Sequence, residues 1–323
     1  MGAQRGTAET ATTLDRADDL VHDAFFYTDA SSYRAGLLGF IRTGLAGDEP
    51  VLVAVPQPGL SLVRSALTAD EEPRVRTADM SVAGRNPGRI IGTVLSAFVR
   101  EHAGRRVRII GEPIWAGRSA EEYPACAEHE ALINVALGAS PAYILCPYDA
   151  THLDRSVLVD ATRTHPILAS GPDRWPSPGY TDSNAVAASF DRPLSASPAH
   201  AVFMVIAPST APKAARQFVQ DYAERARMSA QRAADLCLVA QELTINTLVH
   251  AGARGLLTIW AANDEVVCQV QDGGRIDDPL VGRRAPGPAD VGHGLFAVHQ
   301  VSDLVRVHRR SEGTTVRVHI GLN

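Results

Sequence analysis

Short apolar runs alternate with amphipathic stretches over the first half of the chain. Residues 50–55, 106–110 and 142–146 are β-rich runs, and between them lie the stretches RIIGTVLSAFVREH and ACAEHEALINVAL, with apolar residues near a 3.6-residue period. The short runs predict strands and the longer stretches predict helices. Strands that alternate with helices are typical of an α/β domain with a largely parallel sheet. We therefore predict such a domain over residues 18–167.

A change of pattern separates this region from the end of the chain. Residues 168–198 are rich in Ser, Pro, Asp and Ala and lack periodicity, which predicts an interdomain linker. Over residues 199–322, a short strand and two helical stretches are followed by the strand-like runs GLLTIWA, EVVCQVQ and TTVRVHI. Apolar residues alternate in the last two runs, which indicates a sheet with one buried face. We predict a second α/β domain, with helices on one side of a mixed sheet.

The composition fits two globular domains and removes several classes of function. The chain has 323 residues, of which 45% are hydrophobic and 21% charged, and these proportions are ordinary for globular domains. Its formal net charge of -5 provides no electrostatic basis for nucleic-acid binding. Lys213 is the only lysine. This excludes a G-x-x-x-x-G-K-[ST] phosphate loop and the strand lysine of eukaryotic-type kinases.

The cysteines and the apolar segments bear on the cellular location. The cysteines Cys126, Cys146, Cys237 and Cys268 are widely spaced and form no C-x-x-C pair, which argues against a disulfide framework. The N-terminus lacks the apolar run of a signal peptide, and no run of about 18 apolar residues occurs. We expect a cytoplasmic protein without a membrane segment.

One helix of the second domain carries a polar pair. Glu242 and Asn246 are four residues apart in QELTINTLVHA, so they project from one face of the predicted helix. The neighbouring stripe, which includes Leu243 and Thr247, is expected to pack on the sheet. An amide oxygen suits Mg²⁺, and a carboxylate suits proton transfer. Such a pair alone is also typical of a solvated helix face.

Downstream residues add features expected of a nucleotide site. Asp272 follows a buried strand, where its carboxylate can accept a hydrogen bond from an adenine amino group, and Gly274 allows a base to approach the backbone. Gly292 and Gly294 precede a helix, where free N–H groups can hold phosphate. Thr314 begins the last strand with a hydroxyl available. Taken singly, each of these features is typical of an ordinary turn.

The order of these features resembles a known superfamily. E-x-x-x-N, D-x-G, G-x-G-L and G-T follow one another as do the N, G1, G2 and G3 boxes of the GHKL ATPases. The resemblance covers residues 199–322 and implies a GHKL (Bergerat) α/β sandwich that binds ATP and Mg²⁺. It implies that Glu242 is the catalytic base and Asn246 the Mg²⁺ ligand. The residues that it implies for ATP binding are Asn246, Asp272, Gly274, Gly292, Gly294 and Thr314.

The box around Glu242 is most similar to the RsbW/SpoIIAB-like anti-sigma factors. That resemblance implies a serine/threonine kinase that phosphorylates an anti-anti-sigma (STAS) protein and controls a sigma factor, and it leaves a homodimer open. A non-catalytic nucleotide-binding module that sequesters a sigma factor is the alternative. An orphan histidine kinase is disfavoured, because the nearest upstream histidine, His165, is followed by Pro166 and lies in no long predicted helix.

The first domain resembles a second family. The phrases GRNPGRI, RIIGEPIW, HEALINVAL and LCPYD look like the MEDS (DcmR-like) sensory domain. That family is distantly similar to RecA/KaiC-like folds without the phosphate loop, in agreement with the missing lysine. A MEDS domain joined to a GHKL module is the architecture of RsbA-family anti-sigma regulatory proteins.

The sequence leaves open whether the first domain has a ligand pocket. Glu112, Trp115, Glu130 and Tyr148 are candidates for a ligand pocket, because G-E-P-x-W and C-P-Y-D follow strands, where α/β folds bind ligands. Their prolines are equally typical of strand ends.

Cysteines and histidines of the same domain are candidates for a metal site. The candidates are Cys126, His129, Cys146 and His152, and their spacing fits no familiar zinc pattern. Buried cysteines beside surface histidines are the ordinary interpretation, and the sequence supports no metal prediction here.

Overall fold

The computed structural model describes residues 19–208, 212–252, 254–287 and 293–323, which form two compact units. The first unit contains the described residues up to Gly84 together with Val94–Ser119 and Glu130–Val186. The second contains Arg85–Thr93, Ala120–His129 and the described part of Ala187–Asn323. In the part of the chain described, no helix is both long and apolar enough to cross a membrane.

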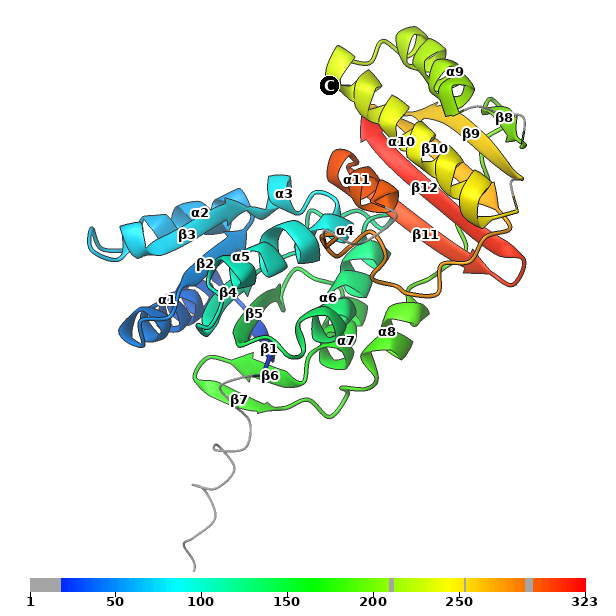
Figure 1. The fold of residues 1–323 in the computed structure, drawn as a ribbon. Helices are drawn as coiled ribbons and strands as arrows, with labels where there is room; N and C mark the ends of the chain where they lie inside the picture. The colour runs from blue at the N-terminus through cyan, green and yellow to red at the C-terminus, as the bar shows by residue number, and fades with distance from the viewer. Residues whose placement is uncertain (1–18, 209–211, 253, 288–292) are drawn as a thin grey trace, which may run out of the picture. The chain divides into compact units, whose positions relative to one another are not determined.

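A seven-stranded sheet organises the first unit (Figure 1). Its strand order is β3-β2-β4-β5-β1-β6-β7, and every pair is parallel except β6 with the edge strand β7. Strands such as β2 are buried along their whole length, as parallel strands covered on both faces should be. The largely parallel sheet confirms the predicted fold class. The strands are β1 (Val21–Tyr27), β2 (Val51–Val55), β3 (Val75–Asp79), β4 (Val107–Gly111), β5 (Ala142–Asp149), β6 (Ile167–Ser170) and β7 (Asp173–Pro176).

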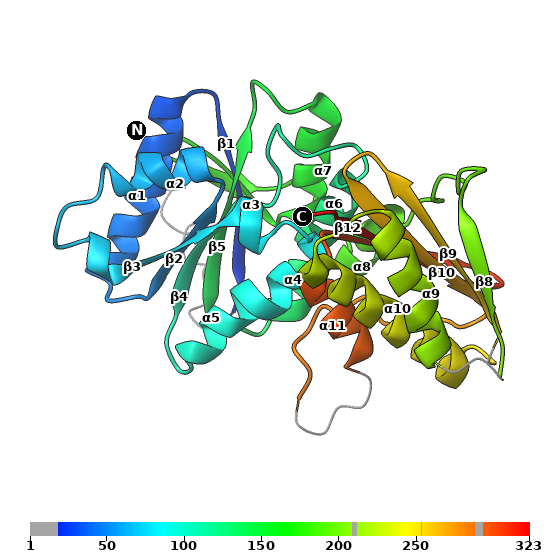
Figure 2. The ribbon, with the colours of Figure 1, turned by 90° about the horizontal axis from the view of Figure 1, so that it is seen from above.

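Helices pack on both faces of this sheet (Figure 2). The face of β1 with Val21 and Phe25 packs in a core with α1 and α2, whereas His22, on the opposite face, contacts Asn134 of α6. Helix α1 starts at a capping box, in which the Asp29 carboxylate accepts from Ser32 N at 2.7 Å. The helices of residues 19–189 are α1 (Ala30–Ala46), α2 (Gln57–Arg64), the 3₁₀ turn η1 (Glu72–Arg74), α3 (Met80–Ala83), α4 (Pro87–Ile90), the π-helical turn η2 (Ile91–Leu95), α5 (Ser96–Glu101), α6 (Tyr123–Leu137), α7 (Arg155–Thr164) and α8 (Ser183–Ser189).

The segment expected to be a linker, 168–198, contains regular structure. Strand β7 pairs with β6 across a turn in which Gly171 adopts φ 56°, and α8 follows. All four residues of β7 are exposed, because it is an edge strand. An exposed edge strand of this length leaves no hydrophobic periodicity, so composition alone indicates a loop.

A five-stranded sheet with order β11-β12-β10-β9-β8 organises the second unit. All of its pairs are antiparallel, so the prediction of a mixed sheet is wrong. The reason lies in the connections, since β9–β10 and β11–β12 are joined by two-residue turns, which only antiparallel neighbours allow. The strands are β8 (Val202–Ile206), β9 (Gly255–Ala262), β10 (Glu265–Asp272), β11 (Leu304–Arg310) and β12 (Gly313–Gly321).

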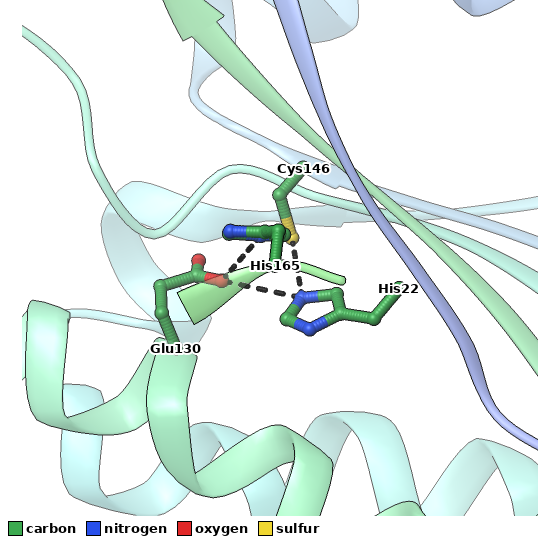
Figure 3. Close-up of side chains that lie close together, drawn as sticks. All are labelled: His22, Glu130, Cys146 and His165. Atoms are coloured by element: carbon green, nitrogen blue, oxygen red, sulfur yellow. Dashed lines mark hydrogen bonds and ion pairs between the residues drawn. The ribbon is translucent and has the colours of Figure 1, made fainter. Parts of the chain in front are cut away.

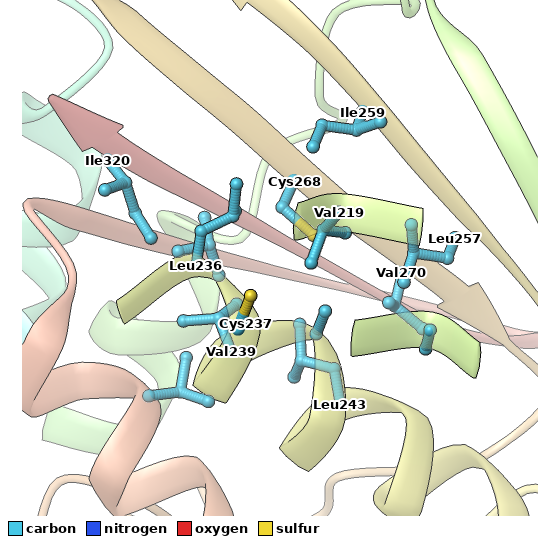
Figure 4. Close-up of a cluster of buried hydrophobic side chains, with 14 of the residues drawn as sticks. Val219, Leu236, Cys237, Val239, Leu243, Leu257, Ile259, Cys268, Val270 and Ile320 are labelled. Atoms are coloured by element: carbon cyan, nitrogen blue, oxygen red, sulfur yellow. The ribbon is translucent and has the colours of Figure 1, made fainter. Parts of the chain in front are cut away.

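The helices of the second unit's C-terminal part pack on one face of that sheet, as predicted. They are α9 (Pro212–Arg225), α10 (Ala230–His250) and α11 (Gly294–Val301). Apolar residues of α10, including Leu236, Val239 and Leu243, interlock with the strand residues Cys268 and Val270 in one core (Figure 4). This core fixes α10 against β10, and so fixes which polar side chains of the helix reach the strand end.

Candidate functional site

A cavity of about 300 Å³ opens between α10, α11 and the ends of β10 and β12. Its apolar walls include Leu243, Val270 and Val316, and its polar lining includes four residues proposed from the sequence. These four are Asn246, Asp272, Gly274 and Thr314. A concave site with apolar walls and a few convergent polar groups is the usual form of a small-molecule pocket, and this volume is at the small end of the usual range.

Asp272 lines the cavity, and two hydrogen bonds hold its carboxylate in place. It is the last residue of β10, where it pairs with Thr314 of β12. Its Oδ1 accepts a hydrogen bond from Gly274 N at 2.9 Å, and its Oδ2 accepts one from Thr247 Oγ1 at 2.6 Å. A carboxylate has about four lone-pair sites, so it can accept a further hydrogen bond from a ligand while its rotamer stays fixed.

The turn after β10 packs closely against the start of β12. Thr314 Oγ1 donates to Gly274 O at 2.8 Å. Gly313 has φ 149°, and a Cβ at that position would lie 1.9 Å from Asp272 O. Only glycine fits there, because any side chain would displace the backbone of Asp272. The D-x-G turn and the G-T strand start are therefore one structural unit.

Glu242 and Asn246 of α10 lie beside Gly294, and of these three residues Asn246 is the one that lines the cavity. A Cβ on Gly294 would lie 2.6 Å from Glu242 Oε2 and 3.6 Å from Asn246 Oδ1. Gly294 begins α11, so the first turn of this helix faces the polar pair of α10. Both polar side chains are half-buried. Gly292, the other glycine of the predicted phosphate turn, lies outside the described residues.

Fixed positive charge is sparse in the cavity lining. Arg275 is the arginine among the lining residues. Its Nε lies 4.0 Å from Asp277 Oδ1, and both side chains are exposed. Exposed pairs of this kind contribute little. An anionic ligand would therefore depend on backbone N–H groups at the start of α11 and on a cation that Asn246 and Glu242 can approach.

Thr247 is a site residue that the sequence interpretation assigned to core packing. It is fully buried on the stripe that faces the sheet, and its hydroxyl also bonds to Leu243 O at 3.1 Å. The available signal was the hydroxyl itself, since a threonine within an apolar stripe must find a buried acceptor. Here the acceptor is Asp272, the residue expected to hold the ligand.

Comparison with known families assigns both halves of the chain. Residues 21–166 match the family model "MEDS: MEthanogen/methylotroph, DcmR Sensory domain". Residues 207–320 match the model "Histidine kinase-like ATPase domain". The chain joins a MEDS domain to a histidine kinase-like ATPase domain. This is the arrangement that the sequence resemblance predicted. The cavity described above belongs to the ATPase domain, whose kind of fold implies nucleotide binding.

Solved structures show partial likeness. One is the pair of RsbU and RsbW domains of Rv1364c from Mycobacterium tuberculosis, at 17% identity and a TM-score of 0.30, covering 39% of this chain and 33% of that one. Another is the histidine kinase domain of a blue-light activated histidine kinase from Erythrobacter litoralis, at 20% identity and a TM-score of 0.24, covering 33% of this chain and 57% of that one. The chain therefore spans about a third and just over half of these proteins. No curated protein sequence matches the chain.

Proposed function

We propose that this protein is an anti-sigma regulatory factor with serine/threonine kinase activity toward a STAS-type anti-anti-sigma protein, so that a signal received by the MEDS domain controls sigma-factor availability. The observation that carries the proposal is the placement of Glu242 and Asn246 against Gly294, with Asn246 in the lining of the same cavity as Asp272. A base-binding carboxylate that shares a cavity with a metal ligand, with a proton acceptor beside that ligand, is an arrangement suited to phosphoryl transfer.

The residues fit Mg²⁺-ATP in chemical type. The apolar walls suit a planar base, and the fixed Asp272 carboxylate suits its exocyclic amino group. Asn246 offers a neutral oxygen ligand, and Mg²⁺ held there would neutralise phosphate charge. The half-buried Glu242 carboxylate lies beside that amide and the α11 N-terminus, where the phosphates would lie.

In the proposed reaction, the hydroxyl oxygen of a partner serine or threonine forms a bond to the γ-phosphorus of ATP. The bond from that phosphorus to the β,γ-bridging oxygen breaks, and ADP leaves. Glu242 accepts the hydroxyl proton, which makes the oxygen a better nucleophile as the new bond forms. Asn246 and the first turn of α11 hold the phosphates in line for this transfer.

Histidine phosphorylation is disfavoured by the geometry of His165. Its side chain is fully buried at the end of α7, with Nδ1 2.9 Å from Ala161 O. Between β6 and β8 the described chain contains β7 and the seven-residue α8, and neither is part of a long helical hairpin that could present a histidine. A partner hydroxyl is the acceptor that this chain's own residues favour.

The test is phosphate transfer from γ-labelled ATP to a candidate STAS protein, with the labelled residue identified by mass spectrometry. The wild type should label a serine or threonine. Glu242→Gln should lower the transfer rate by about 10²–10⁴-fold and leave ATP affinity nearly unchanged, because it removes the proton acceptor only. Glu224→Gln is the matched control, since Glu224 is exposed on α9, whereas Glu242 lies against Gly294 at the start of α11.

Two outcomes contradict the kinase proposal. If the wild type binds ATP and a sigma factor but labels no partner, the non-catalytic sequestering module is correct. If label appears on a histidine of the protein itself, the protein is a histidine kinase.

A further inference from the structure

Four side chains of types that bind metals converge inside the MEDS domain, away from the candidate nucleotide site in sequence and in domain. His22 comes from β1, Glu130 from α6, Cys146 from β5, and His165 from the residue after α7 (Figure 3). One ligand atom of each lies within 4.8 Å of the ligand atoms of the others. All four side chains are at most 1% exposed. Nothing in the proposed kinase function uses this cluster.

Three separations between ligand atoms are close to those around a tetrahedral zinc ion. Glu130 Oε2 lies 3.3 Å from His22 Nε2 and 3.1 Å from His165 Nε2. His22 Nε2 lies 3.4 Å from Cys146 Sγ. Zinc bonds of about 2.0–2.3 Å in a tetrahedron place ligand atoms roughly 3.3–3.7 Å apart. The three separations are close to this range, and every other pair of ligand atoms lies within 4.8 Å.

Outer hydrogen bonds orient both imidazoles toward the centre. His22 Nδ1 lies 3.0 Å from Asn134 Oδ1, and Asn134 Nδ2 donates to Thr164 O at 2.7 Å, so the amide presents its oxygen to the histidine. His165 Nδ1 lies 2.9 Å from Ala161 O, which can only accept. Each neutral ring therefore carries its proton on Nδ1 and directs the Nε2 lone pair at Glu130. This is the outer support that metal-binding histidines typically have.

Without a cation, the centre of the cluster is a concentration of acceptors. Both carboxylate oxygens of Glu130 and His165 Nε2 are buried without a hydrogen-bond partner among the described residues. A carboxylate buried among these lone pairs is stabilised by a cation that the four side chains can bind together.

We propose that His22, Glu130, Cys146 and His165 form a structural zinc site in the MEDS domain. Two neutral imidazoles, one carboxylate and one thiolate balance the charge of Zn²⁺ and occupy its four tetrahedral positions. Zinc coordination would deprotonate the Cys146 thiol. The mixed nitrogen, sulfur and oxygen donors disfavour Mg²⁺ and Ca²⁺, which prefer oxygen alone.

The site would link the centre of the sheet to the helix that covers it. β5, β1 and β6 are adjacent strands, and His165 lies two residues before β6. With Glu130 on α6, the four ligands hold three neighbouring strand regions and one helix together. All four coordination positions are filled by protein side chains, which is the arrangement of structural rather than catalytic zinc.

The test uses the untagged full chain, purified without chelators, with its metals measured by mass spectrometry. We expect one zinc per chain. After zinc is replaced by Co²⁺, the protein should show the visible bands of tetrahedral cobalt and a near-ultraviolet thiolate-to-cobalt band. Cys146→Ala should remove the thiolate band. Cys268→Ala is the matched control, because Cys268 is equally buried but lies in the ATPase domain, and it should keep both features.

Three results overturn the proposal. The first is that a wild type shown to be folded by circular dichroism lacks stoichiometric zinc or the cobalt spectrum even after zinc and cobalt are supplied. The second is that iron or copper occupies the site in place of zinc. The third is that the thiolate-to-cobalt band survives in folded Cys146→Ala. The first two need no variant, so the proposal is testable even if a substitution prevents folding.

Discussion

The two domains gather their functional side chains in different ways. In the ATPase domain the site residues come from elements that follow one another along the chain, from Glu242 and Asn246 on α10 to Thr314 on β12. In the MEDS domain the four cluster residues come from β1, α6, β5 and the end of α7, and only the sheet order brings them together. The first site is open to a ligand, and the second is sealed. The difference suggests that one is built for exchange and the other for structure.

Zinc removal gives the largest expected contrast between the domains. Removing the cation leaves a buried, unpartnered Glu130 carboxylate, so the MEDS domain should lose several kcal/mol of stability. Its melting temperature should fall by roughly 10 °C, at about 2–4 °C per kcal/mol. Affinity for Mg²⁺-ATP should change less than about twofold if the sites are independent. Calorimetric melting and ATP titration of the zinc-free protein measure both, and an unchanged melting temperature would contradict the structural role.

Asp272→Asn should show the reverse pattern in the ATPase domain. The amide presents N–H₂ where the carboxylate accepts from Thr247 or Gly274, and it weakens the contact with a base. Affinity for ATP should fall by about 10- to 100-fold, in line with about 1.5–3 kcal/mol for a hydrogen bond to a charged group. The melting temperature of the MEDS domain should not move. Calorimetric titration is the measurement, and ATP affinity equal to that of the wild type would refute the role given to Asp272.

The buried Glu112 gives the MEDS domain a pH dependence of its own. Burial raises the pKa of Glu112 from 4.5 to about 8, the hydrogen bond from Tyr33 opposes this rise, and Asp149 adds to it. Between pH 4.5 and about pH 8, the folded state keeps the proton of the Glu112 carboxyl, which the unfolded state releases. Stability should therefore fall as pH rises from about 4.5 to 8, by at most about 1.4 kcal/mol per pH unit.

Glu112→Gln should remove this contribution, whereas Glu72→Gln, at an exposed position, should not. Urea unfolding at pH 5.5 and 7.5 measures the free energy of unfolding of each variant and of the wild type. The difference between each variant and the wild type isolates Glu112 from other titrating groups, including the zinc ligands. An identical pH slope for Glu112→Gln and the wild type would show that Glu112 is ionised in the folded domain.

Thr247→Val should have the smallest of the expected effects on ATP affinity. It tests most directly how the Asp272 carboxylate is held. Valine keeps the shape of the buried threonine but removes its hydrogen bond to Asp272 Oδ2. ATP affinity should fall by about 3- to 10-fold, in line with about 1 kcal/mol for a neutral donor. Thr244→Val is the matched control on the same helix, because the Thr244 hydroxyl is buried without a hydrogen-bond partner among the described residues. Equal ATP affinities in the two variants would remove Thr247 from the site.

The sequence predicts the two fold classes because burial leaves a pattern. The fully apolar strand β2 and the alternating strand β10 are distinct in sequence, and each implies a strand of its sheet. The expectation of one buried face is wrong for the second sheet, because consecutive residues of β10 and β12 are buried, polar residues included. The exposed edge strand β7 leaves no such pattern, and the antiparallel order of the second sheet depends on turn lengths rather than on hydrophobicity. Those two features therefore required the structure.

The candidate sites differ in the same way. Asn246, Asp272, Gly274 and Thr314 could be placed in advance because each lies in a short local motif, and the structure brings them to one cavity. The zinc cluster has no local motif. The sequence offers Cys146 and His152 among its metal candidates without supporting a site. In the structure Cys146 faces His22, and Nδ1 of the exposed His152 lies 2.8 Å from Asp149 Oδ2. Alternation along β1 and β5 decides which residues face α6, and the partner strands of a parallel sheet are not adjacent in sequence.

Calorimetric titration of the wild type and Asn246→Ala with ATP, with and without Mg²⁺, tests the central claim most directly. The account predicts one ATP per chain, bound more tightly with Mg²⁺, and loss of this Mg²⁺ dependence in Asn246→Ala because the amide oxygen is the proposed ligand. A wild type that binds no ATP, or an Asn246→Ala variant with the same Mg²⁺-dependent affinity as the wild type, would contradict it.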